Sequence, residues 1–265
     1  DMQPNPDLPK LEFKPEEPIT APVVKEVYGP EAARVMLGWR LPAATDPSND
    51  VADIVGSVLY NGQAGLIDLD LNQQQKVLNS YGYPMGLADY SAFILGGLPK
   101  QGQMLEEVKD LLLNEIKKLR AGEFDEKMLQ ANINNFKLYE LQSMESNEGR
   151  ADIFVNSFIN GTNWEDEVTA IDRMAKLTKE DIVAFADKYL KEDNYAVVYK
   201  KQGKDPNEKK MTKPEITPIV SNRDVASPFL TSIQENAVKP IEPVFLDFKT
   251  VSYTHLRAHE TDSYL

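Results

Sequence analysis

The chain has 265 residues, 42% of them hydrophobic, which is enough for one large domain or two small ones with a globular core. Its formal net charge of −13 argues against a nucleic-acid partner, because phosphate binding needs clustered Lys and Arg. The absence of cysteine excludes disulfides and thiol catalysis. No apolar run approaches the roughly 18 residues that span a bilayer, so we expect no membrane span.

The first residues predict an extended lead-in over 1–22. This stretch is polar and rich in proline, which removes backbone donors and blocks regular pairing. The chain begins with Asp1 rather than Met, which predicts that the true start is missing, together with any targeting signal. The sequence therefore assigns no compartment.

Two strands are predicted next, over 23–28 and 33–42, and we expect them to be joined as a hairpin-like pair at Gly29 and Pro30. The second strand contains more apolar residues. It is therefore expected to lie in the centre of a sheet.

A helix is predicted over 46–62. Asp46 or Ser48 can cap it, apolar residues follow at helical spacing, and Gly62 is a plausible end. A short helix over about 64–75 and two strands within 76–99 are expected to follow.

The most regular pattern is the stretch GQMLEEVKDLLLNEIKKLRAG. Its apolar residues mark one helical face, acidic residues come early, basic residues come late, and Gly122 follows. Further helices are expected within 125–160, over 164–174, and after Thr178, which forms a capping-box pattern with Asp181. The residues predicted to be mostly buried are Val35, Leu37, Trp39, Leu105, Val108, Leu112, Ile116, Ile182 and Phe185.

A strand over 194–200 closes the domain, which we place at 23–200. Residues 201–250 contain repeated prolines and no sustained periodicity, which is typical of a linker, although IEPVFLDF is apolar enough to dock on another surface. Pairs of strands with helices between them predict an α+β fold, in which a largely antiparallel sheet has helices packed on one face.

The sequence predicts no catalytic, cofactor-binding or metal site in residues 1–250. It lacks a phosphate-loop pattern and a nucleophile elbow. Both histidines, His255 and His259, lie in the last fifteen residues, so no Ser-His-Asp triad has a base in the body of the chain. Carboxylates and lysines can also catalyse, and an independent enzyme acting through carboxylates stays open as an alternative.

The tail, VSYTHLRAHETDSYL, spaces its two histidines so that a helix would place them on one face. It resembles an inverted zinc motif, but Ala258 stands where that motif has the Glu that activates water. The tail also resembles one reading frame of a common transposon-type sequencing adapter. We therefore expect 251–265 to be an artefact rather than a metal site, and to pack little on the domain.

The stretches AARVMLGWRLPA, LYNGQAGLIDLDL and LTKEDIVAFADKYL, in this order, resemble one domain of the pitrilysin/insulysin-type zinc metallopeptidases over roughly residues 10–200. The stretch KPIEPVFLDF is similar to the segment that joins the two halves of the large bacterial members. The resemblance implies two halves that close around a peptide-sized chamber, each with two α+β domains. It also implies a zinc held by H-x-x-E-H in the first domain.

Residues 1–250 lack that motif. In the family's last domain, an Arg and a Tyr seven residues apart hold the substrate. Here these positions are Asn72 and Asn79, which supply neither a cationic clamp nor a phenolic donor. The resemblance therefore implies the second domain of the first half, a non-catalytic wall of the chamber.

We thus expect this piece alone to be inactive and to hold no cofactor, whereas the longer protein would be a peptide-degrading zinc metalloendopeptidase. Its partners would be the missing zinc domain and second half of the same chain, with a peptide as substrate. The alternative is an inactive peptidase-like domain used for assembly or peptide binding.

Overall fold

The computed structural model describes residues 14–208, 212–217, 225–236 and 240–244. The chain divides into two compact units, residues 1–209 and 210–265. The tail 251–265, which contains His255 and His259 and is expected to be an artefact that packs little on the domain, lies outside the described residues.

A five-stranded sheet forms the centre of the first unit, with strand order β1-β5-β2-β4-β3. Its pairs are antiparallel, except that β1 runs parallel to β5. The α+β fold with a largely antiparallel sheet is confirmed, as is the central place of the second strand. The strands are β1 (Val23–Gly29), β2 (Arg34–Leu41), β3 (Asn79–Met85), β4 (Ser91–Leu98) and β5 (Tyr195–Gln202).

The predicted pairing of the first two strands is wrong, because β5 lies between them. Val197 of β5 is opposite Val24 of β1 on one side and Leu37 of β2 on the other. The Lys200 ammonium of β5 also donates to the carbonyl of Ala32, in the connection between β1 and β2, at 3.0 Å. Consecutive strands pair often but not always, and here the buried, apolar β5 takes the inner place.

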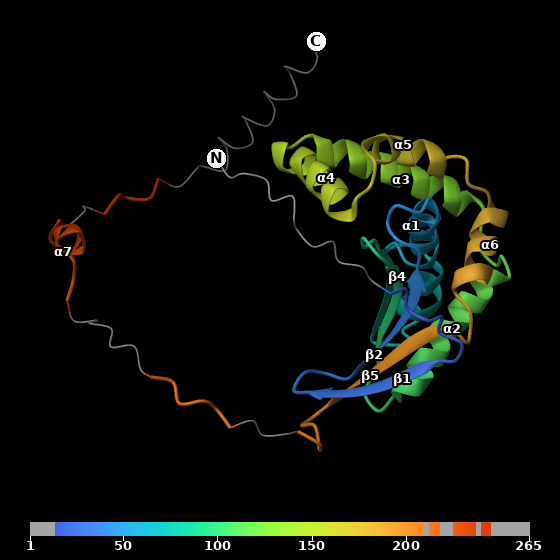
Figure 1. Cartoon of the computed structure of the whole chain (residues 1–265), viewed down its shortest axis with the longest axis horizontal. Coiled ribbons are helices and arrows are strands. Elements are labelled where there is room, and N and C mark those ends of the chain that lie inside the picture. Colours follow the sequence, from blue (N-terminus) through green and yellow to red (C-terminus); the bar gives the residue numbers. More distant parts are fainter. Residues whose placement is uncertain (1–13, 209–211, 218–224, 237–239, 245–265) are drawn as a thin grey trace, which may run out of the picture. The chain divides into compact units, whose positions relative to one another are not determined.

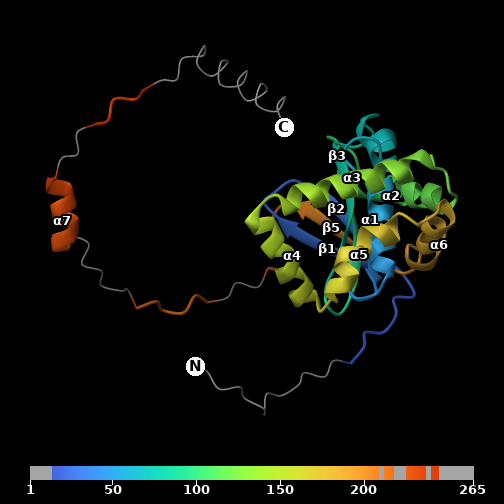
Figure 2. The same cartoon turned by 90° about the horizontal axis from the view of Figure 1, so that it is seen from above.

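Helices α1, α2 and α6 lie together on one side of the sheet (Figure 1). Helices α3, α4 and α5 continue from them, and α3 and α5 pack on α1 (Figure 2). The helical elements of this unit are α1 (Ser48–Leu59), the π-helix η1 (Asp68–Asn72), α2 (Leu105–Arg120), α3 (Lys127–Met144), α4 (Asn147–Asn160), α5 (Trp164–Met174) and α6 (Lys179–Tyr189).

The helix ends match the predicted signals in part. Thr178 and Asp181 form the predicted capping box, and Gly122 follows α2 with a φ of +69°. Asp46 accepts the N–H of Ser48 at 2.9 Å and so assists the start of α1. The predicted end of α1 at Gly62 is wrong: the helix ends at Leu59, and Gly62 lies in the turn that follows.

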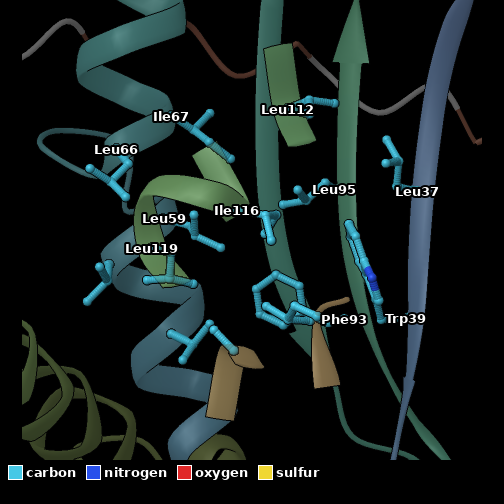
Figure 3. Close-up of a cluster of buried hydrophobic side chains, with 14 of the residues drawn as sticks. Leu37, Trp39, Leu59, Leu66, Ile67, Phe93, Leu95, Leu112, Ile116 and Leu119 are labelled. Carbon is cyan, nitrogen blue, oxygen red and sulfur yellow. The ribbon is translucent and has the colours of Figure 1, made fainter. Parts of the chain in front are cut away.

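The core lies between the sheet and its covering helices (Figure 3). Alternate residues of β2 point into it, and Trp39 is 1% exposed. The Trp39 indole N–H donates to the carbonyl of Lys191 at 2.9 Å, which satisfies its one polar atom. All nine residues predicted to be buried are buried. They come from β2, α2 and α6, so the periodicity argument is confirmed for both strand and helix.

In the second unit, the stretch predicted to be a linker contains one helix, α7 (Pro228–Glu235), which the sequence analysis did not predict. Ser227 caps the helix by accepting the N–H of Leu230 at 3.2 Å, and Pro228 occupies the first turn. A Ser-Pro start is a known helix signal that the sequence reading overlooked. Ile241 and Val244, from the apolar stretch expected to dock, are exposed in the structure.

Each helix in the described part of the chain is too short or too polar to cross a bilayer.

Candidate functional site

The resemblance noted in the sequence assigns Asn72 and Asn79 to the positions where the family's last domain is expected to have Arg and Tyr. The Asn72 side chain accepts the backbone N–H of Ser80 and donates to the Ser80 carbonyl, both at 2.8 Å. It also accepts the Ser80 hydroxyl at 2.8 Å. Asn79, by contrast, is exposed at the start of β3. The amide of Asn72 therefore satisfies the outer edge of β3, as a neighbouring strand would.

A buried carboxylate fixes the loop after α1. Asp68, which is 4% exposed, accepts the backbone N–H groups of Asn61 and Gly65, each at 3.0 Å. A side chain at Gly65 would lie 2.5 Å from the carbonyl oxygen of Leu59, so only glycine fits there. This loop is held by hydrogen bonds from the backbone N–H groups of Asn61 and Gly65 to the Asp68 carboxylate.

A second group of charges joins η1 to α2, and we call it the paired cluster: Asp70, Glu115 and Lys118. The Lys118 ammonium lies 2.6 Å from an Asp70 oxygen and 2.9 Å from a Glu115 oxygen. The hydrogen bond from Lys118 lowers the pKa of Asp70, whereas burial raises the pKa of Glu115, which is 1% exposed. One cation thus holds two carboxylates, and the cluster has a clear structural role.

A third group surrounds a cavity of about 290 Å³, which we call the acidic pocket. Its walls come from the start of α1, the end of β3, the connection between α4 and α5, and α5 itself. Five carboxylates and one guanidinium line it, namely those of Asp46, Asp50, Asp53, Asp166, Glu167 and Arg173.

Arg173 of α5 is bound to Asp50 of α1 inside this pocket. Its Nε lies 2.5 Å from Asp50 Oδ2, and its Nη2 lies 3.3 Å from Asp50 Oδ1. This fork-like pairing explains why α5 packs on α1 although the two residues are 123 positions apart. The hydrogen bond to Asp50 raises the pKa of Arg173.

Asp53 lies one helical turn after Asp50. It makes no side-chain hydrogen bond or ion pair within the described residues. Burial, and then repulsion from Asp50, raise the pKa of Asp53 to about 7. The residue is therefore divided between its neutral and charged forms near neutral pH.

The sequence analysis missed this pocket and its members. A spacing of three residues between Asp50 and Asp53 puts both on one side of a helix, but solvated helix faces carry the same pattern. What distinguishes Asp50 and Asp53 from such residues is the packing of α5, with Arg173, against α1. This is a contact between segments that lie far apart in the sequence. The presence of this pocket does not test the expectation that residues 1–250 hold no catalytic or metal-binding residues. That expectation stays a prediction.

Solved structures with the same fold include a protease from Helicobacter pylori, with 18% identity and a TM-score of 0.70 over 74% of this chain and 48% of that chain. A peptidase M16 inactive domain from Pseudomonas fluorescens matches with 17% identity and a TM-score of 0.63 over 75% of this chain and 47% of that chain. An inactive peptidase domain from Bordetella parapertussis matches with 16% identity and a TM-score of 0.57 over 64% of this chain and 93% of that chain. This chain therefore spans about half the length of the first two.

The family model described as "Peptidase M16 inactive domain" matches residues 1–136, which is about half of the sequence. The chain belongs to this family, and it is a non-catalytic, pitrilysin-like domain. This agrees with the resemblance noted in the sequence, and an inactive domain implies that no catalytic metal is held here. No curated protein matches the sequence.

Proposed function

We propose that the chain is the second domain of the first half of a longer zinc metallopeptidase that degrades peptides. In this proposal it forms part of the wall of the substrate chamber, while the zinc domain and second half of the same protein supply the remainder. The observation that carries the proposal is the match to the inactive peptidase domain over residues 1–136. The proposal divides the chain into a lead-in (1–22), the domain (23–200), an inter-half linker (201–250) and an adapter-derived tail (251–265).

The open face of the sheet supports the role of a chamber wall. Residues of β2 that point away from the helices, such as Met36 and Gly38, are only half-buried, and Ile94 of β4 lies opposite Gly38 on the same face. An added side chain at Gly38 would meet nothing within 4 Å. Met36, Gly38 and Ile94 form a small apolar patch on this face, flanked along β2 by Arg34 and Arg40. We infer that a peptide can lie on this patch without a change in the core.

The full-length gene provides the first test. Amplification from source DNA should show an upstream H-x-x-E-H motif and a coding sequence that departs from VSYTHLRAHETDSYL after codon 250. A gene without any upstream zinc motif would instead favour the second candidate, an inactive peptidase-like domain used for assembly or peptide binding. Reads that continue into the present tail and then a stop codon would contradict the adapter origin.

The open face provides a test in the full-length protein. Gly38→Arg should leave the fold intact and raise KM for peptides, because the new side chain projects from the open face. Gly97→Leu is the matched control for the covered face, where an added side chain comes within 2.4 Å of Val108 and should unfold the domain. Normal peptide turnover by a folded Gly38→Arg protein would exclude a chamber wall at this face.

A further inference from the structure

We propose that a cavity between the end of α1 and the first half of α3 binds a neutral carboxamide group attached to an apolar ring or chain. This cavity of the first unit has a volume of about 250 Å³, and we call it the amide pocket. Asn61 and Gln63, from the loop after α1, line it together with Asn132 and Asn135 of α3. The inference does not depend on whether the longer protein cleaves peptides.

Asn132 is the polar residue of the amide pocket that is turned from solvent, with an exposed fraction of 2%. Its side-chain oxygen accepts a hydrogen bond from the Asn61 amide at 3.3 Å. Its side-chain nitrogen, Nδ2, is also buried, but no group of the described residues accepts a hydrogen bond from it. Because buried polar groups nearly always have a partner, an unsatisfied donor beside a cavity indicates a ligand that supplies an acceptor.

The neighbouring hydrogen bonds determine which atom of the Asn132 amide lacks a partner. The Asn61 side-chain oxygen accepts the backbone N–H groups of Gln63 and Ala64, at 3.0 and 2.9 Å. The Asn61 nitrogen must therefore face the other way, where it donates to the Ser57 carbonyl at 3.2 Å and to Asn132. A reversed Asn132 amide would place two NH₂ groups against each other, and neither can accept. The unsatisfied group is thus a donor.

The contact with Asn61 explains only part of the Asn132 side chain. It connects the loop after α1 to α3, but it uses the Asn132 oxygen alone. It gives no role to Nδ2, which is costly to bury without an acceptor. A ligand carbonyl that enters from the cavity would accept from Nδ2 and remove this cost.

The remaining wall selects a neutral ligand with an apolar part. Although the chain has a net charge of −13, no charged side chain of the described residues lines the amide pocket. Met128, Phe136 and Tyr139 supply a thioether and two rings that can pack on an apolar group. The side-chain amides of Gln63 and Asn135 make no hydrogen bond among the described residues, so they can accept N–H groups. A carboxamide on an apolar group matches this wall and the donor of the buried amide.

Nitrogen-edited NMR on the full chain tests the inference, with benzamide as the probe. The side-chain NH₂ signals of Asn132, assigned by their loss in Asn132→Leu, should shift as benzamide is added. Those of Asn134, which is exposed on the same helix and outside the pocket, should not shift. Acetophenone keeps the ring and the carbonyl but lacks the N–H groups, so it should bind about two- to tenfold more weakly, the value of one neutral hydrogen bond.

A second probe distinguishes two sources of the same chemistry. N-acetyl-L-glutamine amide carries the carboxamide on a peptide side chain, and N-acetyl-L-methionine amide is its control without that group. Tighter binding of the glutamine compound than of benzamide would identify a polypeptide side chain as the occupant. Tighter binding of benzamide would identify a free aromatic carboxamide.

Two substitutions complete the test. Asn132→Leu removes the donor at nearly constant volume and should weaken benzamide binding at least about threefold, whereas Asn134→Leu is the matched control and should have no effect. Ala131→Phe, at an exposed position of the pocket wall, should fill part of the cavity and weaken binding severalfold without a change in the core. Far-UV circular dichroism verifies the fold of each variant.

Three results would overturn the proposal. The first is an Asn132 NH₂ signal that does not move up to the solubility limit of benzamide, which would mean that a buried water satisfies Nδ2. The second is equal affinity for benzamide and acetophenone. The third is unchanged benzamide affinity in folded Asn132→Leu or, if that variant does not fold, in Ala131→Phe.

Discussion

The paired cluster and the acidic pocket both place carboxylates between helical elements of the first unit, but they compensate the charge differently. In the paired cluster, Lys118 lies within 3.1 Å of three carboxylate oxygens from Asp70 and Glu115. In the acidic pocket, Arg173 serves Asp50 alone, and Asp53 is left with a raised pKa. The paired cluster is a completed charge network with a structural role, whereas no side chain of the described residues compensates the charge of Asp53.

The largest expected effect concerns the pH dependence set by Asp53. The pKa of this residue rises from 3.8 to about 7 on folding, so the folded protein holds a proton that the unfolded chain has released. The contribution of Asp53 to stability is present below about pH 4 and is lost as the pH rises through 7. A shift of this size corresponds to at most about 4 kcal/mol.

Asp53→Asn should remove this loss. Relative to the unchanged chain, the variant should gain about 2–4 kcal/mol in free energy of unfolding between about pH 4.5 and pH 8. Urea denaturation at several pH values measures the difference, and Asp172→Asn serves as the exposed control. Parallel pH profiles for Asp53→Asn and the unchanged chain would mean that Asp53 is ordinarily solvated.

The second effect tests the paired cluster. Lys118→Met keeps most of the side-chain length but leaves Glu115, at 1% exposure, beside Asp70 without a cation. Because Lys118 and Asp70 are each about a quarter exposed, solvent relieves part of the penalty, and we expect a loss of about 2 kcal/mol at neutral pH.

Lys117→Met is the matched control for this change. Lys117 is more than half exposed, and its distance to Glu192 is 3.7 Å, so its removal should cost less than about 0.5 kcal/mol. Chemical denaturation at constant pH compares the two variants. A similar small cost for both would show that the paired cluster adds no stability.

The sequence predicted those parts of the fold that depend on local patterns. Periodicity identified the buried faces of β2 and α2, and capping chemistry identified the start of α6 at Thr178. The insertion of β5 between β1 and β2 could not be found in this way, because it depends on packing across more than 150 residues.

The same division holds for the candidate site. Resemblance to the family placed Asn72 where the family's last domain is expected to have Arg, and the structure shows that the Asn72 amide binds Ser80. The acidic pocket could not be predicted in this way, because it forms only where α5 packs on α1. No residue near Asp50 or Asp53 in the sequence indicates that Arg173 binds there. The place of Asp53 in the pocket wall and the nearby charge of Asp50, rather than its residue type, distinguish it from the many solvated carboxylates of this acidic chain.

The smallest effect concerns a neutral counterpart of the paired cluster, the bond between Asn72 and Ser80. Ser80 is fully buried, and its backbone N–H and carbonyl both depend on the Asn72 amide at 2.8 Å. Asn72→Ala leaves the Ser80 N–H and carbonyl without that partner. Because Asn72 is only half-buried, water can enter and relieve part of the cost. We expect the free energy of unfolding to fall by about 1 kcal/mol in chemical denaturation, with faster amide exchange at Ser80.

Asn79→Ala, seven residues away and exposed, is the control and should change stability by less than about 0.5 kcal/mol. Equal effects of the two substitutions would show that Asn72 does not hold the edge of β3, and that its position is open to another role.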